Sequence, residues 1–408
     1  YSKLVFKCER GLPMNKVVDN LKDKVYKFKD TLPIVQNLRN EDMKERHWEK
    51  VQDTMNQELV RDASFTLGLL MSYSVENYKD DIARISTEAT QEAALEGMLK
   101  KINDKWQDIE FTVLPFKELK DAFILGGVDE IIAALEDSMV TMSVILASRF
   151  VTGIRAEVDK LNNQLRLFSD TLDEWLECQK QWMYLESIFS AADIQRQLPN
   201  ESKAFFAVDK QFKDIMRRTK DRGNALQAGS TPGWLEPFQK SNETLEKVQK
   251  NLEDYLETKR MSFPRFYFLS NDELLEILSQ TKNVQAVQPH MSKCFDGIKS
   301  LDFGDDPKST DIFGMKSGEG EYVSLGKNLR ARGNIEKWLT DVETFMQNSL
   351  KRLGKKGYND YASTERKEWI LNQPAQLVLS CHSIHWCGEL EACLGPNNED
   401  PGSALTAF

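Results

Sequence analysis

The sequence predicts a protein dominated by α-helices: an elongated rod of antiparallel helical bundles with one or two small β-hairpins. Three observations support this. The 408 residues include only 21 glycines and 12 prolines, while 29% of the residues are charged, which favours a helical, well-packed chain. Apolar residues recur at intervals of three and four over long stretches, as on one face of an α-helix. Two short stretches instead place turn residues between apolar runs, which indicates hairpins.

The bulk composition excludes several classes of protein. A formal net charge of −10 at pH 7 argues against a protein whose main task is binding nucleic acid. Six scattered cysteines indicate free thiols in a reducing compartment. No stretch approaches the ~18 apolar residues of a membrane span, and the N-terminus has no signal-peptide apolar region. The sequence also lacks an initiator Met, so we expect a piece of a longer protein.

Residues 1–150 are expected to form the N-terminal helical subdomains. A helix over 14–30 should stop before Pro33, which can open the next helix as its first residue. A long amphipathic helix covers 75–106, where apolar residues follow a helical period. The expected core positions of the second helix are Met43, Trp48 and Val51.

A change of period follows this long helix. Apolar runs at 111–114 and 122–125 flank a polar stretch, which favours a β-hairpin, with an irregular loop as the alternative. The next segment, 128–150, is an unusually apolar helix whose methionine-rich stripe is typical of packed core rather than of a cofactor site.

The most regular segment runs from Ile154 to Phe189, within the expected central subdomain 151–235. Its apolar residues alternate at spacings of four and three with one polar gap at Gln179. Such heptads fit a dimeric coiled coil or a long helix inside an antiparallel bundle, and the aromatic residues favour the bundle. We expect this helix to end at Pro199.

Residues 236–394 are expected to form C-terminal helical subdomains with a β-hairpin at about 311–325. A helix over 235–259 precedes a strand-like aromatic run, Phe266 to Leu269, and Ser270 or Asn271 can cap the following helix. Strands at 311–316 and 321–325 flank a Ser-Gly-Glu-Gly turn. Helices then resume over 334–353 and 364–394, and residues 395–408 have the composition of a tail.

No motif predicts chemistry. The sequence contains no G-x-x-x-x-G-K-[ST] phosphate loop, and no nucleophile, base and acid occur at a spacing that argues for catalysis. Cys381 and His385 share a helical face, but His382 and Cys387 point elsewhere, so four ligands could reach one metal ion only if the helix broke. We therefore predict no catalytic residue, no cofactor and no metal site.

A set of ordered blocks carries a family resemblance. They include LPIVQNLRNEDMKERHWEKV, EAALEGMLKKINDKW, W(x6)WMYLESIF(x3)DIQRQLP(x5)FFAVD, RFYFLSNDELLEILSQ, GMKSGEGEYVSL, IEKWLTDVETFM and RKEWILNQPAQLVLSCHSIHW. Together they cover about residues 14–394 and resemble the linker region of dynein heavy chains, in the axonemal form. The residues that stand out in these blocks are Arg46, His47, Trp48, Trp106, Trp175, Trp182, Tyr184, Phe189, Pro199, Trp338, Trp369 and Trp386.

The resemblance implies a mechanical function. The linker of these motors is a curved rod that lies across the AAA+ ring of the same heavy chain, joins the tail at one end and the first AAA+ module at the other, and bends during the ATPase cycle. It implies a monomeric, non-enzymatic piece of an ATPase, partnered by that ring and by neighbouring tail segments, without nucleic acid or membrane. It also implies a cytoplasmic, cytoskeletal location in a ciliary or flagellar axoneme.

Two alternatives remain open from the residues alone: a static helical scaffold, and a tethering coiled coil built on the heptads. For the lever, a compliant point should lie where a long helix bridges two bundles. We therefore predict a hinge at Gly153 and Ile154, at the start of the heptad helix.

Overall fold

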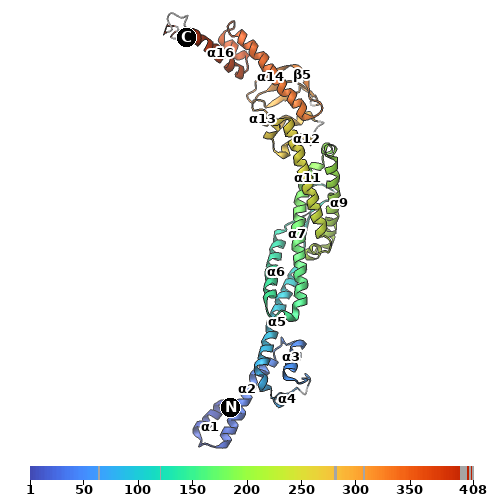
Figure 1. Ribbon diagram of the computed structural model, residues 1–408, viewed down its shortest axis with the longest axis vertical. Coiled ribbons are helices and arrows are strands. Elements are labelled where there is room, and N and C mark those ends of the chain that lie inside the picture. Colours follow the sequence, from blue (N-terminus) through green and yellow to red (C-terminus); the bar gives the residue numbers. More distant parts are fainter. Residues whose placement is uncertain are drawn as a thin grey trace. The chain divides into compact units, whose positions relative to one another are not determined.

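The structure is a computed structural model that describes residues 1–62, 65–119, 121–279, 283–306 and 308–395, with residues 402, 403 and 406. Helices dominate and small antiparallel sheets accompany them (Figure 1), which confirms the predicted fold class. The chain divides into two compact units. The first is Tyr1–Leu176 with Lys213–Phe238, and the second is Glu177–Phe212 with Gln239–Phe408. The predicted division at residues 150 and 235 stays a prediction.

The first unit begins with a series of helices and one 3-10 turn, η1. They are α1 (Ser2–Gly11), α2 (Lys16–Leu38), α3 (Glu45–Met55), α4 (Leu67–Ser72), η1 (Val75–Tyr78) and α5 (Lys79–Gln107). The prediction that Pro33 separates two helices is wrong, because Pro33 lies inside α2. The helix continues through the proline because Ile34 and Leu38 beyond it are buried, and this burial offsets the hydrogen bond that proline cannot make.

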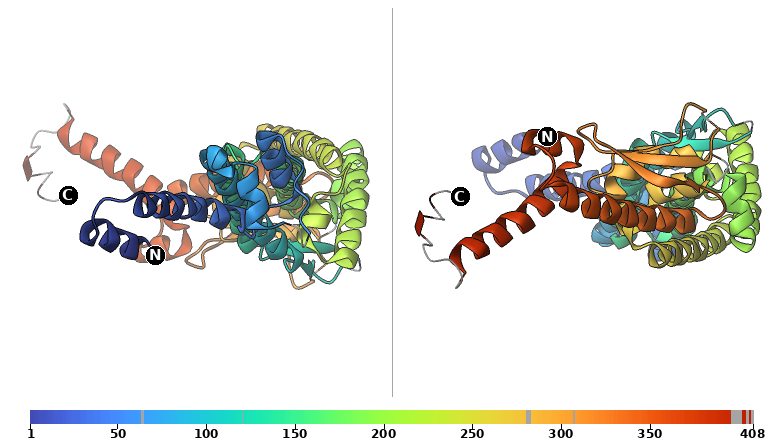
Figure 2. Two further views of the ribbon diagram at one scale, coloured as in Figure 1. Left: turned by 90° about the horizontal axis from the view of Figure 1, so that it is seen from below. Right: turned by 90° about the horizontal axis from the view of Figure 1, so that it is seen from above.

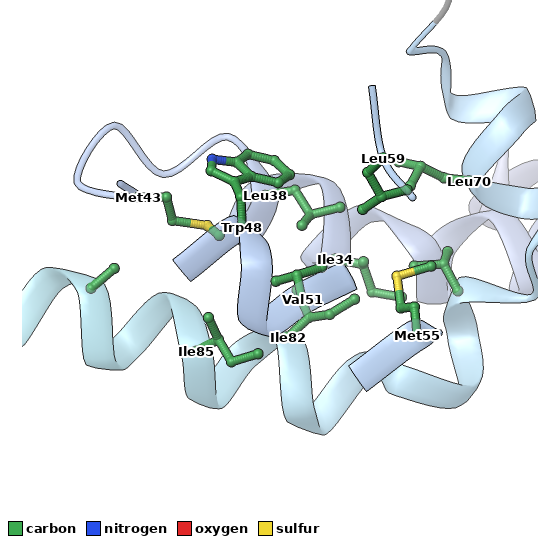
Figure 3. Packing of buried hydrophobic residues seen from close by; sticks show 12 residues of the cluster. Ile34, Leu38, Met43, Trp48, Val51, Met55, Leu59, Leu70, Ile82 and Ile85 are labelled. Carbon is green, nitrogen blue, oxygen red and sulfur yellow. The ribbon is translucent and has the colours of Figure 1, made fainter. Parts of the chain in front are cut away.

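Helices α2, α3 and α4, the turn η1 and the start of α5 enclose a hydrophobic core cluster, drawn in Figure 3. The predicted core residues Met43, Trp48 and Val51 all belong to it, which confirms that prediction. Trp48 meets Phe65 edge to face, with ring centroids 6.0 Å apart, an arrangement that the aromatic quadrupole favours. The cluster joins α2 and α3 to the N-terminal half of α5.

The hairpin prediction is confirmed after α5. Strands β1 (Thr112–Pro115) and β2 (Phe123–Gly126) pair antiparallel. Gly127 then adopts a φ of +60°, which is easily reached without a Cβ, and α6 (Asp129–Ala147) begins. The 3-10 turn η2 (Thr152–Ile154) leads into the longest helix, α7 (Arg155–Phe189).

Helix α7 ends at Phe189, ten residues before the predicted stop. The Gln195 side chain donates a hydrogen bond of 2.6 Å to the carbonyl oxygen of Phe189 and so partners a group that the helix end leaves free. A short helix, α8 (Ala192–Gln197), follows, and Pro199 is the first residue of α9 (Pro199–Arg222). The prediction for Pro199 is therefore wrong: this proline starts a helix, where its missing N–H costs nothing.

The remaining elements follow in chain order. They are α10 (Ala225–Gly229), α11 (Leu235–Ser262), η3 (Pro264–Phe268), α12 (Asn271–Ser279), η4 (Val284–His290), α13 (Met291–Cys294), β3 (Ser300–Asp302), β4 (Asp311–Lys316), β5 (Tyr322–Arg330), α14 (Ile335–Asp360), α15 (Arg366–Asn372) and α16 (Ala375–Leu394). The division between the two compact units falls inside α7, α9 and α11.

Three details of the second unit differ from expectation or refine it. The aromatic run after Phe263 is the 3-10 helix η3 rather than a strand, with Pro264 at its start and Phe266 buried. The predicted helix over 364–394 is interrupted before Pro374, because a residue that precedes proline avoids helical angles. Ser270 caps α12 as predicted: its Oγ accepts the Glu273 N–H, and the Glu273 carboxylate accepts the Ser270 N–H, a capping box.

The predicted second hairpin is confirmed, and the structure adds a third strand that was not predicted. β4 pairs antiparallel with β5 and also with β3, in the order β3-β4-β5. The sheet packs beside α14 (Figure 2, right), where Ser349 Oγ donates a hydrogen bond of 3.1 Å to the carbonyl of Leu325 in β5. Most of the predicted tail at 395–408 lies outside the described residues. No helix among the described residues is long and apolar enough to cross a membrane.

Candidate functional site: aromatic stacks and a buried charge cluster

Two of the family-motif tryptophans of the first unit, Trp106 and Trp175, lie in one aromatic stack, whereas Trp48 lies in the N-terminal core cluster. Trp106 meets Phe168 edge to face at 5.4 Å, and its Nε1 donates a hydrogen bond of 3.0 Å to Ser138 Oγ. Trp175 stacks on Phe238 at 5.1 Å and meets Trp234 edge to face. These rings come from α5, α7, α11 and Trp234, the residue just before α11, and are buried, so each helix is held by rings of the others.

Close packing extends to a backbone position in this stack. A Cβ at Gly229 would stand 2.1 Å from Phe168 Cδ2. The short helix α10 therefore approaches the phenylalanine ring more closely than any residue with a side chain could.

The second unit contains the matching stack around Trp182 and Phe189. Trp182 is 0% exposed and stacks on Phe212 at 4.7 Å, and its Nε1 donates a hydrogen bond of 2.9 Å to Asp209 Oδ1. Phe189 stacks on Phe205 at 5.3 Å. The heptad residues of α7 are thus covered by the chain's own helices, which favours the bundle over a dimeric coiled coil.

Two further motif residues of this region are less buried. Tyr184 is half-buried, and burial raises the pKa of its hydroxyl, with nearby Asp272 and Glu253 adding to the rise. Pro199 is exposed at the start of α9. Neither lies in the aromatic stacks.

The C-terminal motif tryptophans differ in their surroundings. Trp338 and Trp369 are buried, and Trp369 Nε1 donates a hydrogen bond of 2.7 Å to the Gly357 carbonyl. Trp386 is 46% exposed. His385 of α16 stacks on Tyr358 at 4.3 Å and on Tyr361 at 4.1 Å, so this histidine packs against the C-terminal end of α14.

The cysteines and histidines give no metal centre in the described part of the chain. There, no group of three or more His, Cys, Asp or Glu side chains is arranged to hold a metal ion. All six cysteines are free thiols. Cys381 Sγ lies 3.5 Å from the Gly354 carbonyl, which places it against α14.

A buried charge cluster brings together the N-terminal motif residues and the candidate hinge. Glu92 in α5 is 3% exposed and forms an ion pair with Arg46 of α3. His47 of α3 lies beside the same carboxylate. Arg46 also reaches Glu96 at 3.1 Å. Gly153 of η2 lies against the same pair: a Cβ there would stand 2.5 Å from Glu92 Oε2 and 2.8 Å from Arg46 Nε. We call these four residues, Arg46, His47, Glu92 and Gly153, the Glu92 cluster.

The protonation of His47 follows from its contacts. The Lys44 N–H donates a hydrogen bond of 3.1 Å to His47 Nδ1, so in the neutral ring the proton resides on Nε2, which lies 3.4 Å from Glu92 Oε2. Burial lowers the pKa of His47, and the adjacent Arg46 guanidinium lowers it further. The imidazole is therefore held neutral while Arg46 compensates the buried carboxylate.

Glu92 was not singled out from the sequence, although a signal was available. In the apolar stripe of α5, Ala89 and Leu95 are six positions apart rather than three or four, and Glu92 occupies the core position between them. A carboxylate in a core position requires a buried cation nearby. Glutamates are common on this helix, so only the tertiary structure distinguishes this one. Ile154, the second hinge candidate, is 5% exposed at the start of α7.

Comparison with known proteins assigns the family. Residues 1–357 match the family model described as dynein heavy chain, N-terminal region 2. Human dynein axonemal heavy chain 6 is 47% identical over 426 residues, covering 100% of this chain and 10% of the relative. Mouse dynein axonemal heavy chain 2 is 39% identical over 388 residues, covering 93% and 9%. The chain thus spans about a tenth of the length of these relatives, and it belongs to the dynein heavy chain family, in the N-terminal region of its axonemal members.

Proposed function

We propose that this chain is the linker of an axonemal dynein heavy chain: a mechanical lever that bends and straightens over the AAA+ ring of the same polypeptide and so produces the power stroke of a microtubule motor. The match of residues 1–357 to the dynein heavy chain family carries the proposal. In this function the chain contributes no chemistry of its own. Its partners are the ring and the neighbouring tail, and it acts in the axoneme of a cilium or flagellum.

The packing within each unit supports a role in transmitting force. A lever must resist deformation, and densely interlocked aromatic side chains do so because protein cores are close-packed and hardly compressible. The stacks of Trp175 with Phe238 and of Trp182 with Phe212 each fix two helices in one register.

The location of the flexible point stays a proposal. We propose that the lever flexes around α7, with Gly153 and Ile154 at its start as candidate hinge residues. The contacts of Gly153 offer a second explanation for the glycine: it permits the close approach of η2 to the Glu92 cluster. Hydrogen exchange separates the two explanations, because a hinge predicts faster exchange near Gly153 than in the flanking helices. Fast exchange confined to 223–233 would place the hinge elsewhere.

The lever itself is tested in the whole heavy chain. Fluorophores attached through bio-orthogonal unnatural amino acids at Lys100 and Gly318, exposed positions in the first and second unit, report the distance between the units without labelling the native cysteines. We expect energy transfer to differ between the nucleotide-free and ATP-bound motor. Equal transfer in all nucleotide states would favour a static scaffold.

The coiled-coil alternative is tested on the 408-residue chain. Since the heptad residues Phe168, Trp175 and Trp182 are each 0% exposed, we expect light scattering to give a monomer mass at micromolar concentration. A dimer that dissociates on mutation of α7 would support the coiled coil.

A further inference from the structure

A groove in the second unit lies between β5 and α14. It has a volume of about 300 Å³ and is lined by Leu325, Lys327, Phe345, Asn348, Ser349 and Arg352. Leu325 is buried beneath the groove. Phe345 supplies partly exposed apolar surface, and Lys327 and Arg352 supply two exposed cations. The groove therefore offers both kinds of contact to one ligand.

The backbone of β5 fixes one of these cations. A Cβ at Gly326 would stand 2.1 Å from Arg352 Nη1, and Gly326 has a φ of +74°. The glycine lets the guanidinium lie directly against the strand, where a side chain would exclude it. The bond from Ser349 Oγ to the Leu325 carbonyl ties α14 to the strand beside this contact, so both walls of the groove are held together.

The groove continues into a row of uncompensated positive charge. Lys351, Arg352, Lys355 and Lys356 follow one another on exposed positions of α14, and Lys327 is exposed on β5. Arg352 and Lys356 are four residues apart and so share a helical face. In the described part of the chain, none of these five cations forms an ion pair.

We propose that this groove binds an acidic segment of a protein partner, with an apolar side chain seated on the partly exposed ring of Phe345 and flanking carboxylates paired with Lys327 and Arg352. A guanidinium and a carboxylate can form a bidentate ion pair with two parallel hydrogen bonds. The groove borders the middle of α14, far from the helix start at Ile335, so side chains rather than helix N–H groups supply the donors. The cations beyond the groove can pair with further carboxylates along the peptide, and their positive charge raises the association rate of an acidic peptide.

Fluorescence anisotropy on the 408-residue chain tests the proposal. The probe is a labelled peptide of about twelve residues, rich in glutamate with one central phenylalanine, a length suited to one groove. We expect saturable binding that weakens with salt. The double variant K327E/R352E should weaken it about tenfold or more, because it places like charges against the carboxylates.

The matched control is K100E/K101E, which makes the same charge change on exposed lysines of α5 in the first unit and should leave binding nearly unchanged. Equal loss in both variants would overturn the proposal, since attraction would then be diffuse. Equal binding by a peptide with serine in place of phenylalanine would also overturn it. So would full competition by inorganic phosphate at constant ionic strength, which would assign the groove to a small anion. Circular dichroism confirms that both variants are folded.

Discussion

Gly153 lies so close to Glu92 that a Cβ at residue 153 would stand 2.5 Å from the Glu92 carboxylate. The two residues are 61 positions apart in the sequence, and their contact joins the start of α7 to α5. Since Glu92 also forms an ion pair with Arg46 and lies beside His47, one buried carboxylate connects α3, α5 and η2. A buried charge held in this way is costly to disturb, because a lost partner leaves it uncompensated.

Gly153→Ala should therefore destabilise the chain. The added methyl group forces Glu92 and Arg46 apart, and overpacking of this kind costs about 1–3 kcal/mol. Urea denaturation followed by tryptophan fluorescence measures the effect. Gly97→Ala is the matched control: it lies in α5 with nothing within 4 Å of the added Cβ, so it should stabilise the helix by about 0.5–1 kcal/mol. Equal urea midpoints for the two variants would show that the Glu92 cluster rearranges around the added methyl group without a measurable loss of stability.

His47 should remain neutral at pH values where an exposed histidine is protonated. Its pKa in the folded chain lies below the ordinary 6.5. Between the folded and the unfolded pKa, the imidazole of the unfolded chain binds a proton that the folded chain does not. The contribution of His47 to the free energy of unfolding is therefore fully present above pH 6.5 and is lost as the pH falls below 6.5. Imidazole NMR signals, assigned with His47→Gln, measure this pKa directly. A His47 titration midpoint at or above 6.5 would contradict the assignment.

Trp182→Ala should cost about 3–5 kcal/mol, as truncations of large buried aromatic side chains do. The sequence-based prediction that Trp182 is buried is confirmed, since it is 0% exposed. Trp182→Phe keeps a ring against Phe212 but removes the donor to Asp209, and should cost about 1–3 kcal/mol. Thermal unfolding measures both, with Trp386→Ala as the control because that indole is 46% exposed. A larger loss for Trp386 than for Trp182 would reverse this ranking.

The isolated chain should bind neither ATP nor ADP and should not hydrolyse ATP. The motivation is the sequence itself, in which no phosphate loop occurs. Titration calorimetry at micromolar concentration checks binding, and phosphate release checks hydrolysis. Stoichiometric uptake of either nucleotide would refute the prediction.

The sequence determined the fold class and most of the elements. The heptad spacing in α7 placed Trp175 and Trp182 on one buried stripe, because the 3.6-residue period alone decides which side chains share a helical face. Turn residues between apolar runs located both hairpins for a similarly local reason. The prolines were predicted less well, because Pro33 lies inside a helix and Pro199 begins one. Whether a helix continues past a proline depends on how deeply the surrounding residues are buried, and the local sequence pattern does not contain that information.

The tertiary structure alone decided which residues meet. Periodicity marked Trp182 as core but could not supply Asp209 as the acceptor of its N–H. It presented Glu92 as one carboxylate among many on α5 and gave no reason to link it with Gly153. Contacts between residues far apart in the chain depend on how several helices pack at once, and the sequence of any one helix does not contain that information. Glu92 and Gly153 acquire their significance only when α3, α5 and the start of α7 are assembled around a single buried charge.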